Sequence, residues 1–421
     1  MISDLIRLLF QLVTFIPPFA STALRQRISA FLHKRSYKPL PSAQIKNVVV
    51  IGGSFAGFQA TKRLTETLPS GYRVVLVEKN SHLNYLFAFP RFSVVKGYET
   101  YAFIPYDGLA KGAPKGIFVH VQDTAAKVRE KFVELKSGER LEYEYLIIAT
   151  GVVSVLPSKV DSTDSYGAQE ELRGMQDRIA AAGKIAVVGG GAVGVELASD
   201  IKDFYPQKDV TLIHSRESLL PTFGGRLQEY VMRRFEEMGV AVLLNERPKL
   251  PDNCNTLVLH GKQQAFDLII PCTGQRPNSL ILSTLSPTCV SKETSHIIVR
   301  PTLQICDSRF PNVFACGDVA ATGGPKTARA AFMQDEVVVR NIISLIEGRE
   351  SLEDYRPLVW IEGSIKLTLG KSRMVVYTRE ESGREILIPL NMGKTDMDVK
   401  RQWVFFGADS RTMEMGDSSS V

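Results

Sequence analysis

The chain contains a continuous apolar run rich in β-branched residues, Lys46–Ile51, which is typical of a strand buried on both faces of a parallel sheet. A glycine-rich turn over 52–57 follows, and residues 58–68 then form a stretch compatible with a helix. A second apolar run, Tyr72–Val77, ends in the acid Glu78. Strand, glycine turn, helix, strand and terminal acid in this order predict a βαβ unit that binds a dinucleotide.

The same order recurs later in the chain. Lys184–Val188 has the pattern of a strand, 189–194 of a glycine turn, 195–204 of a helix and 210–213 of the next strand. One glycine-rich turn alone is weak support for a dinucleotide site, because such turns are common. Two of them, each between a strand and a helix, predict two dinucleotide-binding folds in one chain.

Three further strand ends indicate how the two folds are arranged. Tyr145–Ile148 runs into a small-residue turn, Leu268–Pro271 repeats this pattern, and residues 312–316 end in Gly317 and Asp318 before a helix expected over 327–345. The first fold is therefore interrupted by the second and resumes near residue 290. We predict an α/β protein with two nested Rossmann-like domains, for FAD and NAD(P), and a smaller C-terminal α+β region.

The expected boundaries follow from these patterns. An N-terminal segment over 1–43 precedes the FAD-binding domain over 44–165 and 290–345, which encloses the NAD(P)-binding domain over 166–289. A C-terminal region over 346–408 follows, with strands expected at 363–369, 373–377 and 385–389. The polar tail over 409–421 is expected to be disordered.

The N-terminal segment differs from the rest of the chain. Residues 5–19 are almost wholly apolar, and on a helix the polar side chains at 4, 7, 11 and 14 form one narrow stripe. Pro17 and Pro18 are expected to end this helix, which is then short of the about 20 residues needed to span a bilayer.

A second stretch over 24–35 carries apolar side chains on one side and cations around them, and residues 37–42 have the composition of a linker. We interpret the segment as an amphipathic pair that lies in a membrane interface, with its cations near anionic head groups. A helix packed on the protein's own body and a cleaved targeting peptide are the alternatives.

Composition narrows the function classes further. The 421 residues carry a formal charge of +6, which suits an anionic cofactor, a membrane surface or nucleic acid and decides among none of them. No two of the five cysteines are spaced as CxxC, and their number is odd, so a disulfide framework and a zinc site are disfavoured and a reducing intracellular compartment fits best. The six histidines show no metal-ligand spacing, and we expect no metal.

The first glycine turn is expected to hold the FAD pyrophosphate, because glycines allow close backbone approach and the helix N-terminus attracts anions. Ser54 replaces the middle glycine, and its small hydroxyl can donate to a phosphate oxygen. Glu78 is expected to accept from the ribose, and Asp318 to hold the ribityl chain; an ordinary strand-end acid and a helix cap are the alternatives. The expected FAD-binding residues are Gly52, Gly53, Ser54, Phe55, Ala56, Gly57, Glu78, Ala149, Thr150, Gly151 and Asp318.

The second turn is expected to hold the nicotinamide dinucleotide at Gly189, Gly191 and Gly194, with Gly274 in the neighbouring turn. Where the first unit has Glu78, the second has no acid but Ser215 and Arg216, whose donors and charge suit the 2′-phosphate of NADPH. Glu217 keeps NADH open as the donor.

Two further residues are candidates for a catalytic role. Lys326 precedes, and Thr327 begins, the helix expected over 327–345, whose N-terminus is expected to point at the flavin pyrimidine ring, where helix dipole and lysine charge stabilise the reduced anion. Lys326 as a solvated loop lysine is the alternative. Glu196 either faces the site of hydride transfer or is an ordinary acid near a helix N-terminus.

The order of these motifs resembles the pyridine nucleotide-disulfide oxidoreductase superfamily over roughly residues 45–345. The segment 81–97 contains no cysteine, so the chain resembles a branch without a redox disulfide. In detail it is similar to the AMID or ferroptosis suppressor protein family, relatives of apoptosis-inducing factor, and this likeness extends to about residue 405. The segments that carry it are 52–57, 102–106, 212–215, 317–318, 325–328 and 363–371.

This resemblance implies additional FAD contacts from Arg91 and from the backbone of Val121. It also implies an enzyme that oxidises NADH or NADPH and reduces quinones, often at a membrane. The similarity to type II NADH dehydrogenases is weaker, because residues 328–334 depart from the Ala-Gln-x-Ala-x-Gln pattern of their quinone site. Candidates for an apolar acceptor lining are Phe332, Met333 and Trp360.

We therefore expect electrons to pass from NAD(P)H through FAD to a lipophilic quinone or another small-molecule acceptor. A tailoring oxidoreductase of specialised metabolism is the first alternative. A redox-sensing, nucleic-acid-binding protein with slow turnover is the second, but nucleic acid is a disfavoured partner because the cations concentrate in residues 25–38 and are otherwise mixed with acids.

Overall fold

The computed structural model describes residues 2–41, 44–250 and 255–410. The disordered tail expected over 409–421 lies almost wholly outside these ranges, as does the last residue of the linker expected over 37–42.

The first sheet is parallel, with the strand order β19-β9-β1-β2-β5. Its strands are β1 (Lys46–Ile51), β2 (Tyr72–Val77), β5 (Phe118–Val121), β9 (Tyr145–Ile148) and β19 (Val313–Ala315). Because both faces of its central strands are buried, these strands are continuous apolar runs. The pairing of β19 with β9 confirms that the first fold resumes after a long interruption.

The interruption contains a second parallel sheet, with the order β13-β12-β11-β16. Its strands are β11 (Lys184–Val188), β12 (Asp209–Ile213), β13 (Ala241–Leu243) and β16 (Leu268–Pro271). Three helices belong to this part of the chain: α5 (Ser165–Ala181), α6 (Ala192–Phe204) and α7 (Gly225–Met238). The two nested Rossmann-like folds are therefore present as expected, and the residue-level domain boundaries stay predictions.

The first helix of each fold begins three residues earlier than we expected. Helix α2 spans Phe55–Thr65 instead of 58–68, and α6 begins at Ala192 instead of residue 195. Ser54 and Gly191, both in extended conformation, are the N-cap residues. The glycine turn thus contributes the first helical turn itself, although glycine has a low helix propensity, because the tight approach to the strand decides the conformation.

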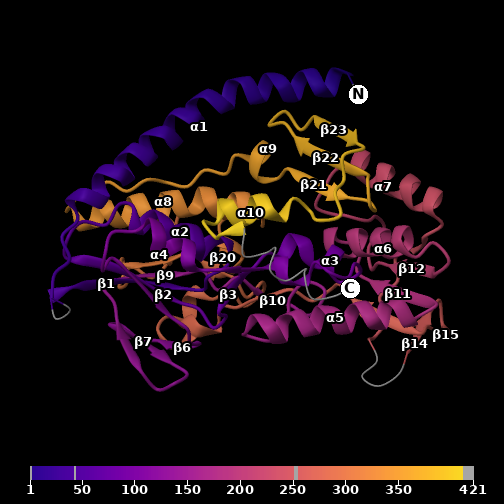
Figure 1. Ribbon diagram of the computed structural model, residues 1–421, viewed down its shortest axis with the longest axis horizontal. Coiled ribbons are helices and arrows are strands. Elements are labelled where there is room, and N and C mark those ends of the chain that lie inside the picture. Colours follow the sequence, from indigo (N-terminus) through magenta and orange to yellow (C-terminus); the bar gives the residue numbers. More distant parts are fainter. Residues whose placement is uncertain (1, 42–43, 251–254, 411–421) are drawn as a thin grey trace.

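The C-terminal region is α+β, as predicted. Its antiparallel sheet contains β21 (Ile365–Thr368), β22 (Met374–Arg379) and β23 (Glu385–Leu390), and two short helices, α9 (Val359–Glu362) and α10 (Val399–Phe405), flank it in sequence. Leu367 and Tyr377 from this sheet join the hydrophobic core of the second fold, whereas Trp403 joins that of the first. The region therefore packs on both dinucleotide folds (Figure 1).

Smaller elements complete the fold. The paired strands are β3 (His82–Asn84) with β4 (Phe103–Pro105), β6 (Ala125–Val128) with β7 (Phe132–Leu135) and β8 (Arg140–Glu142), β10 (Val152–Val153) with β17 (Arg276–Pro277), β14 (Thr256–Leu259) with β15 (Lys262–Ala265), and β18 (Ile297–Ile298) with β20 (Ala320–Ala321). The helices are α3 (Phe89–Phe92), α4 (Asp107–Gly112) and α8 (Ala328–Ile346), with 3₁₀ turns η2 (Leu86–Ala88), η3 (Glu99–Ala102), η4 (Leu280–Thr284), η5 (Pro287–Cys289) and η6 (Gly317–Val319).

The N-terminal segment is one helix, α1 (Ile2–Ser36), that continues through Pro17 and Pro18. Our expectation that the prolines end it was wrong. The helix arches along one side of the molecule beside α8, α9 and β23 (Figure 1) and contacts β23. Contacts with the body on both sides of the prolines hold the two halves in line, and tertiary contacts of this kind offset the missing backbone donors.

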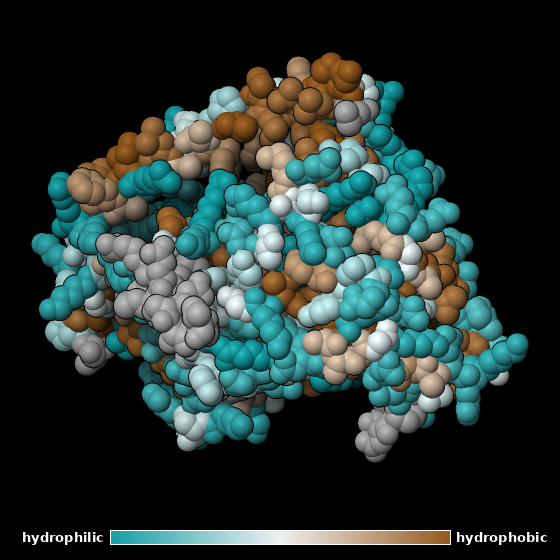
Figure 2. All heavy atoms as spheres, turned by 45° about the vertical axis from the view of Figure 1, so that its right-hand side comes forward, coloured by the Kyte–Doolittle hydropathy of each residue, from teal (hydrophilic) through white to brown (hydrophobic). Residues whose placement is uncertain are grey.

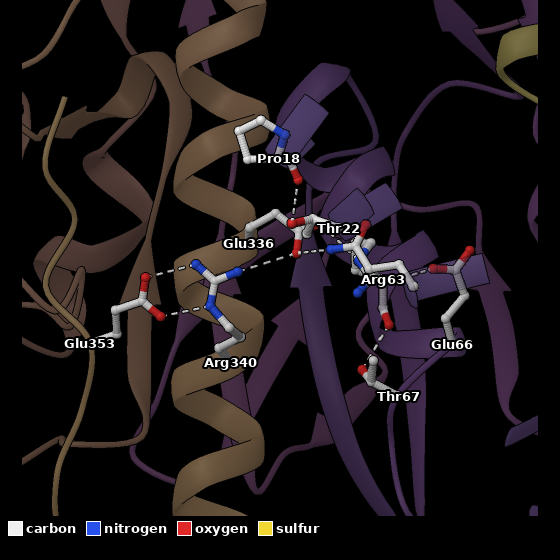
Figure 3. A network of polar contacts seen from close by, with 9 residues as sticks. Pro18, Thr22, Arg63, Glu66, Thr67, Glu336, Arg340 and Glu353 are labelled. Atoms are coloured by element: carbon white, nitrogen blue, oxygen red, sulfur yellow. Dashed lines mark hydrogen bonds and ion pairs between the residues drawn. The ribbon is translucent and has the colours of Figure 1, made fainter. Parts of the chain in front are cut away.

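These contacts of α1 are polar at both ends. Near its start, Asp4 forms an ion pair of 2.7 Å with Arg226 of α7. Further along, Gln26 donates to Glu336 of α8 at 3.0 Å, and His33 Nε2 lies 2.7 Å from the Leu68 carbonyl oxygen. Figure 3 shows Arg63 of α2 and Arg340 of α8 converging on Glu336, with Nε of Arg63 at 2.7 Å. The inward face of α1 is thus joined to a charged network that links α2 and α8.

Candidate functional site

The first glycine turn brings the end of β1 against the start of α2. Gly52 has a φ of +99°, and a Cβ added to Gly57 would lie 1.6 Å from the Gly52 carbonyl oxygen. No side chain fits at Gly57 without moving this backbone, so the glycine is required there. The turn consequently presents the N-terminus of α2, with its unpaired backbone N–H groups, as an anion site.

Glu78 supports this turn from the end of the neighbouring strand. Its Oε2 accepts from the Gly53 backbone N–H at 2.5 Å, and its Oε1 accepts from the backbone and side-chain amides of Asn80 at 2.9 and 2.7 Å. The Tyr106 hydroxyl donates to the Gly53 carbonyl at 2.9 Å from the other side. The carboxylate has four lone-pair sites, so one acceptor position is left for a ribose hydroxyl.

The next residues of the turn have different environments. The side chain of Ser54 makes no capping bond to α2, so its hydroxyl is free to donate to a phosphate. The Phe55 ring packs on Phe87 with centroids 5.0 Å apart and on Phe406 at 6.1 Å. Ala56 faces Gly317, where an added Cβ would come within 3.0 Å of the Ala56 side chain. The Gly-Asp turn therefore lies directly against the first turn of α2.

Asp318 follows Gly317 and has basic side chains nearby. Burial raises the pKa of Asp318, and the nearby Lys326, Lys159 and His296 oppose this shift. Lys159 interacts with both Glu78 and Asp318, and its pKa is lowered mainly by burial. No motif marks Lys159, so sequence reasoning missed it. Its ammonium donates to the Val152 carbonyl, and both acids influence its charge, which makes it a candidate for contacting the phosphates or the ribityl chain.

The turn after β9 and the segment after β16 are hydrogen-bonded to each other beside the end of the first sheet. The Ala149 carbonyl lies against Gly52, the Thr150 hydroxyl donates to the Asn278 carbonyl at 2.7 Å, and the Asn278 N–H donates to the Gly151 carbonyl at 2.9 Å. Gly274, with a φ of +86°, turns the second segment. The expected residues from both folds are thus joined at one edge.

The second glycine turn repeats the geometry of the first. Gly189 has a φ of +127°, and a Cβ added to Gly194 would lie 1.9 Å from the Gly189 carbonyl oxygen. A Cβ added to Gly191 would meet only open space, which leaves room above the start of α6 for a phosphate.

His214 takes the position in the second turn that Glu78 has in the first. The Gly190 N–H donates to His214 Nδ1 at 3.1 Å. Burial and the nearby Arg216 lower the pKa of His214, so the imidazole is neutral and Nδ1 accepts. Ser215 and Arg216 are exposed beside it and leave the cofactor side of the turn without an acid at this position.

The two candidate catalytic residues lie in different surroundings. Glu196 Oε1 accepts from the backbone N–H and the hydroxyl of Thr368, both at 3.0 Å, and burial raises the pKa of Glu196 to about 7. Lys326 donates to the Ala320 carbonyl, and burial lowers its pKa. Thr327 caps α8 by accepting from the Ala330 N–H at 3.1 Å, directly after Lys326 in the chain.

Val121 and Arg91, the two FAD contacts implied by the resemblance, lie in different surroundings. The Val121 carbonyl accepts from the Glu78 N–H at 3.1 Å, so Val121 lies beside the expected ribose site. Arg91 is buried, and its guanidinium pairs with Asp200 of α6 at 2.7 Å and donates to the Gly370 carbonyl at 2.8 Å. These contacts join Arg91 to the second fold and the C-terminal region, and its contact with FAD stays a prediction.

The candidates for an acceptor lining lie on the α1 side of the molecule. The Trp360 ring meets Phe15 of α1 edge-on at 5.4 Å, Phe332 stacks on Phe405 at 6.1 Å, and Met333 packs on the core of the first fold.

Two nested parallel folds, each with a glycine turn that fits a dinucleotide pyrophosphate, define an FAD-dependent NAD(P)H oxidoreductase. Residues 46–334 match the pyridine nucleotide-disulphide oxidoreductase family, and the chain belongs to this family.

Relatives extend this result over most of the chain. It is 35% identical to Fe-regulated protein 8 of Mycosarcoma maydis over 86% of this chain and 96% of that protein. It is 32% identical to ferroptosis suppressor protein 1 of Homo sapiens over 74% and 83%, respectively. The fold is similar to the sulfide:quinone oxidoreductase of Aquifex aeolicus, with a TM-score of 0.69 and 19% identity over 89% of this chain and 93% of that one.

Proposed function

We propose that this oxidoreductase transfers electrons from NADPH, through FAD, to a lipophilic quinone at a membrane surface. Bound FAD supplies the redox chemistry, since it accepts a hydride and releases electrons to a second substrate. The protein residues bind and orient the two dinucleotides and hold protons near them.

The observation that carries this proposal is the outward face of α1. Figure 2 shows an apolar band along the top of the molecule, and large apolar side chains of α1 lie more than two-fifths exposed. They are Ile2, Leu5, Ile6, Leu9, Phe10, Val13, Ile16, Phe19, Leu24, Ile28, Phe31 and Leu32. A continuous exposed apolar face of this kind is typical of a membrane contact.

The contacts of α1 favour a helix that lies on the bilayer. Among the described residues, α1 is the one helix long and apolar enough to cross a membrane. However, Asp4 is buried against Arg226, and Gln26 is bound to Glu336, so both halves are tied to the body. With the outer face in the acyl boundary, Arg25, Arg27 and Arg35 lie near the head groups. A lipophilic acceptor then reaches the protein from the bilayer.

The donor proposal depends on the second turn. Neutral His214 with Arg216 beside it lacks the negative charge that repels a 2′-phosphate, which favours NADPH over NADH. Glu196, with its pKa raised to about 7, is suited to hold or release a proton near neutral pH.

Steady-state NADPH oxidation by the FAD-loaded protein tests the proposal. We expect turnover with a short-chain ubiquinone analogue in solution and with a long-chain ubiquinone in anionic vesicles. If neither quinone supports turnover while a simple dye acceptor does, the quinone proposal is wrong.

A matched pair of α1 variants tests the membrane part. Phe10→Asp removes a large exposed apolar side chain, and we expect about tenfold slower turnover with vesicle-bound quinone, because burial of such a side chain stabilises by roughly 1.5–3 kcal/mol. Turnover with the soluble analogue is expected to be unchanged. Ser29→Asp adds the same charge at an exposed polar site and serves as control.

A further inference from the structure

Two cysteines outside both dinucleotide turns lie in direct contact. The Sγ atoms of Cys289 and Cys306 are 2.7 Å apart, and both thiols are free. Cys289 ends the turn η5 and is fully buried, whereas Cys306 is exposed. One sulfur is therefore open to a reagent in solution, and the other is held behind it as its neighbour.

The chain between the two cysteines folds back on itself beside the cofactor edge. Isolated bridges pair Val290 with Ile297 and Val299 with Ile305, and the Cys306 N–H donates to the Ile298 carbonyl at 3.0 Å. Strand β18 in the middle of this segment pairs with β20, two residues beyond Asp318. The cysteines thus close the base of a loop over 290–305 that borders the Gly317–Val319 turn.

Polar neighbours of the pair contact the buried Cys289 side chain. The Ser286 hydroxyl lies 3.3 Å from Cys289 Sγ and 2.7 Å from Asp307 Oδ2, and Asp307 forms an ion pair with Arg309 at 2.7 Å. Burial, together with the adjacent Cys289, raises the pKa of Cys306 to about 11. Only a small fraction of Cys306 is thiolate at neutral pH, so thiol–disulfide exchange at this site is slow. The equilibrium between the reduced and oxidised pair, and not the rate, is therefore the quantity to measure.

We propose that Cys289 and Cys306 are a reversible dithiol–disulfide pair, oxidised by small-molecule disulfides of the glutathione class. The Cys306 thiolate attacks one sulfur of the oxidant, a mixed disulfide forms, and one glutathione leaves as the thiol. The Cys289 sulfur then attacks Cys306, its proton goes to the second departing glutathione, and an intramolecular disulfide results. Two thiols lose two electrons and two protons, and one glutathione disulfide becomes two glutathione molecules.

The disulfide is expected to stabilise the folded protein, because a cross-link between the ends of the segment 290–305 reduces the freedom of the unfolded chain. Since β18 is bound to β20, the cross-link also restrains the turn that carries Asp318. We expect slower FAD release in the oxidised protein, and this second effect rests on the proposed role of Asp318.

Equilibration of the full-length, FAD-loaded protein with glutathione buffers of increasing oxidation tests the pair. After acid quenching and alkylation, peptide mapping is expected to show one cross-link between the Cys289 and Cys306 peptides, formed in a single two-electron transition. The Tm is expected to rise with the fraction cross-linked. Free alkylation of both cysteines in the most oxidising buffer, or glutathione left on Cys306 without a cross-link, would overturn the proposal.

Two variants separate the pair from the other thiols. Cys306→Ser changes an exposed side chain and is expected to abolish the cross-link and the rise in Tm, whereas Cys254→Ser, outside the described residues, is expected to keep both. If the cross-link and the rise in Tm are observed but FAD release is unchanged, the disulfide proposal stands and only the proposed role of Asp318 is contradicted. A Tm rise that survives in Cys306→Ser contradicts the disulfide itself.

Discussion

Glu78 and His214 perform the same task in the two glycine turns with different chemistry. Each accepts the backbone N–H of the second glycine in its turn, Gly53 at 2.5 Å and Gly190 at 3.1 Å. In the proposed placement of the two dinucleotides, the acid brings a negative charge to the ribose of FAD, whereas the imidazole brings none to the ribose of the nicotinamide dinucleotide. We therefore expect the second turn to tolerate a 2′-phosphate.

We expect His214→Glu to lower kcat/KM for NADPH relative to NADH by about tenfold or more, since an unscreened like-charge contact costs several kcal/mol. Steady-state kinetics with both donors measures this ratio. His214→Asn, which keeps a neutral acceptor for the Gly190 N–H, is the control and is expected to preserve the preference. An unchanged ratio in His214→Glu would show that His214 does not face the 2′ position.

Glu196 is expected to make stability depend on pH. Its carboxyl has an ordinary pKa of 4.5, and burial raises this to about 7 in the folded protein. Between these values the unfolded chain releases the proton and the folded protein keeps it, so the free energy of unfolding falls as pH rises from about 4.5 to 7. Glu196→Gln is expected to lack this component. Urea unfolding at pH 5.5 and 8 measures it, and parallel pH profiles for both proteins would contradict it.

Polar contacts hold the inner side of α1 to the neighbouring helices. Gln26 of α1 donates to Glu336 of α8, which also pairs with Arg63 of α2. Amphipathic helices of soluble proteins normally turn their apolar face inward, and α1 has the reverse arrangement. Its attachment combines these polar contacts with the edge-on packing of Phe15 on Trp360, and each polar contact can be tested by substitution.

We expect Arg226→Ala to release the N-terminal half of α1, because Asp4 loses the partner that keeps its pKa low and its charge compensated. Hydrogen exchange is expected to speed up over residues 2–16 and to stay slow near Gln26. Arg233→Ala, an exposed arginine on the same helix α7, is the control. Equal exchange in both variants would mean that the Asp4 ion pair does not hold α1.

Most strands of the two sheets could be predicted from the sequence, because a strand buried on two faces needs a continuous apolar run. The edge strands β5 and β13 are only partly buried and were not predicted. The helix starts at Phe55 and Ala192 could not, since close packing against the strand, not helix propensity, sets them. The continuation of α1 through its prolines depends on contacts with Arg226 and Glu336, far away in sequence. In the site, Glu78 and Asp318 have motif positions, whereas Lys159 comes close enough to feel the charge of both acids only after folding.

Arg91 connects all three parts of the molecule. It comes from the first fold, pairs with Asp200 of the second, and donates to the Gly370 carbonyl of the C-terminal region, with the ion pair almost fully buried. A buried charge that loses its partner is costly, so this contact couples the stabilities of the three parts.

We expect Arg91→Met to lower the free energy of unfolding by about 3–5 kcal/mol, since Asp200 is left as an unpaired buried charge. The double variant Arg91→Met/Asp200→Leu is expected to recover most of this loss in denaturant unfolding. The FAD content of the double variant then tests the cofactor contact: a stable protein that binds FAD normally would rule out a direct role for Arg91.

The nested order of the two folds also constrains how the chain is made. Ala315 of β19 pairs with Ile148 of β9, so the first sheet lacks its edge strand until position 315 has been synthesised, 167 residues after 148. At about 5–20 residues per second, this delay is roughly 10–30 seconds, during which the four strands of the inserted sheet can pair. The second sheet can therefore form before the first one receives β19, whereas the core of the second fold closes only when Leu367 and Tyr377 arrive from the C-terminal region.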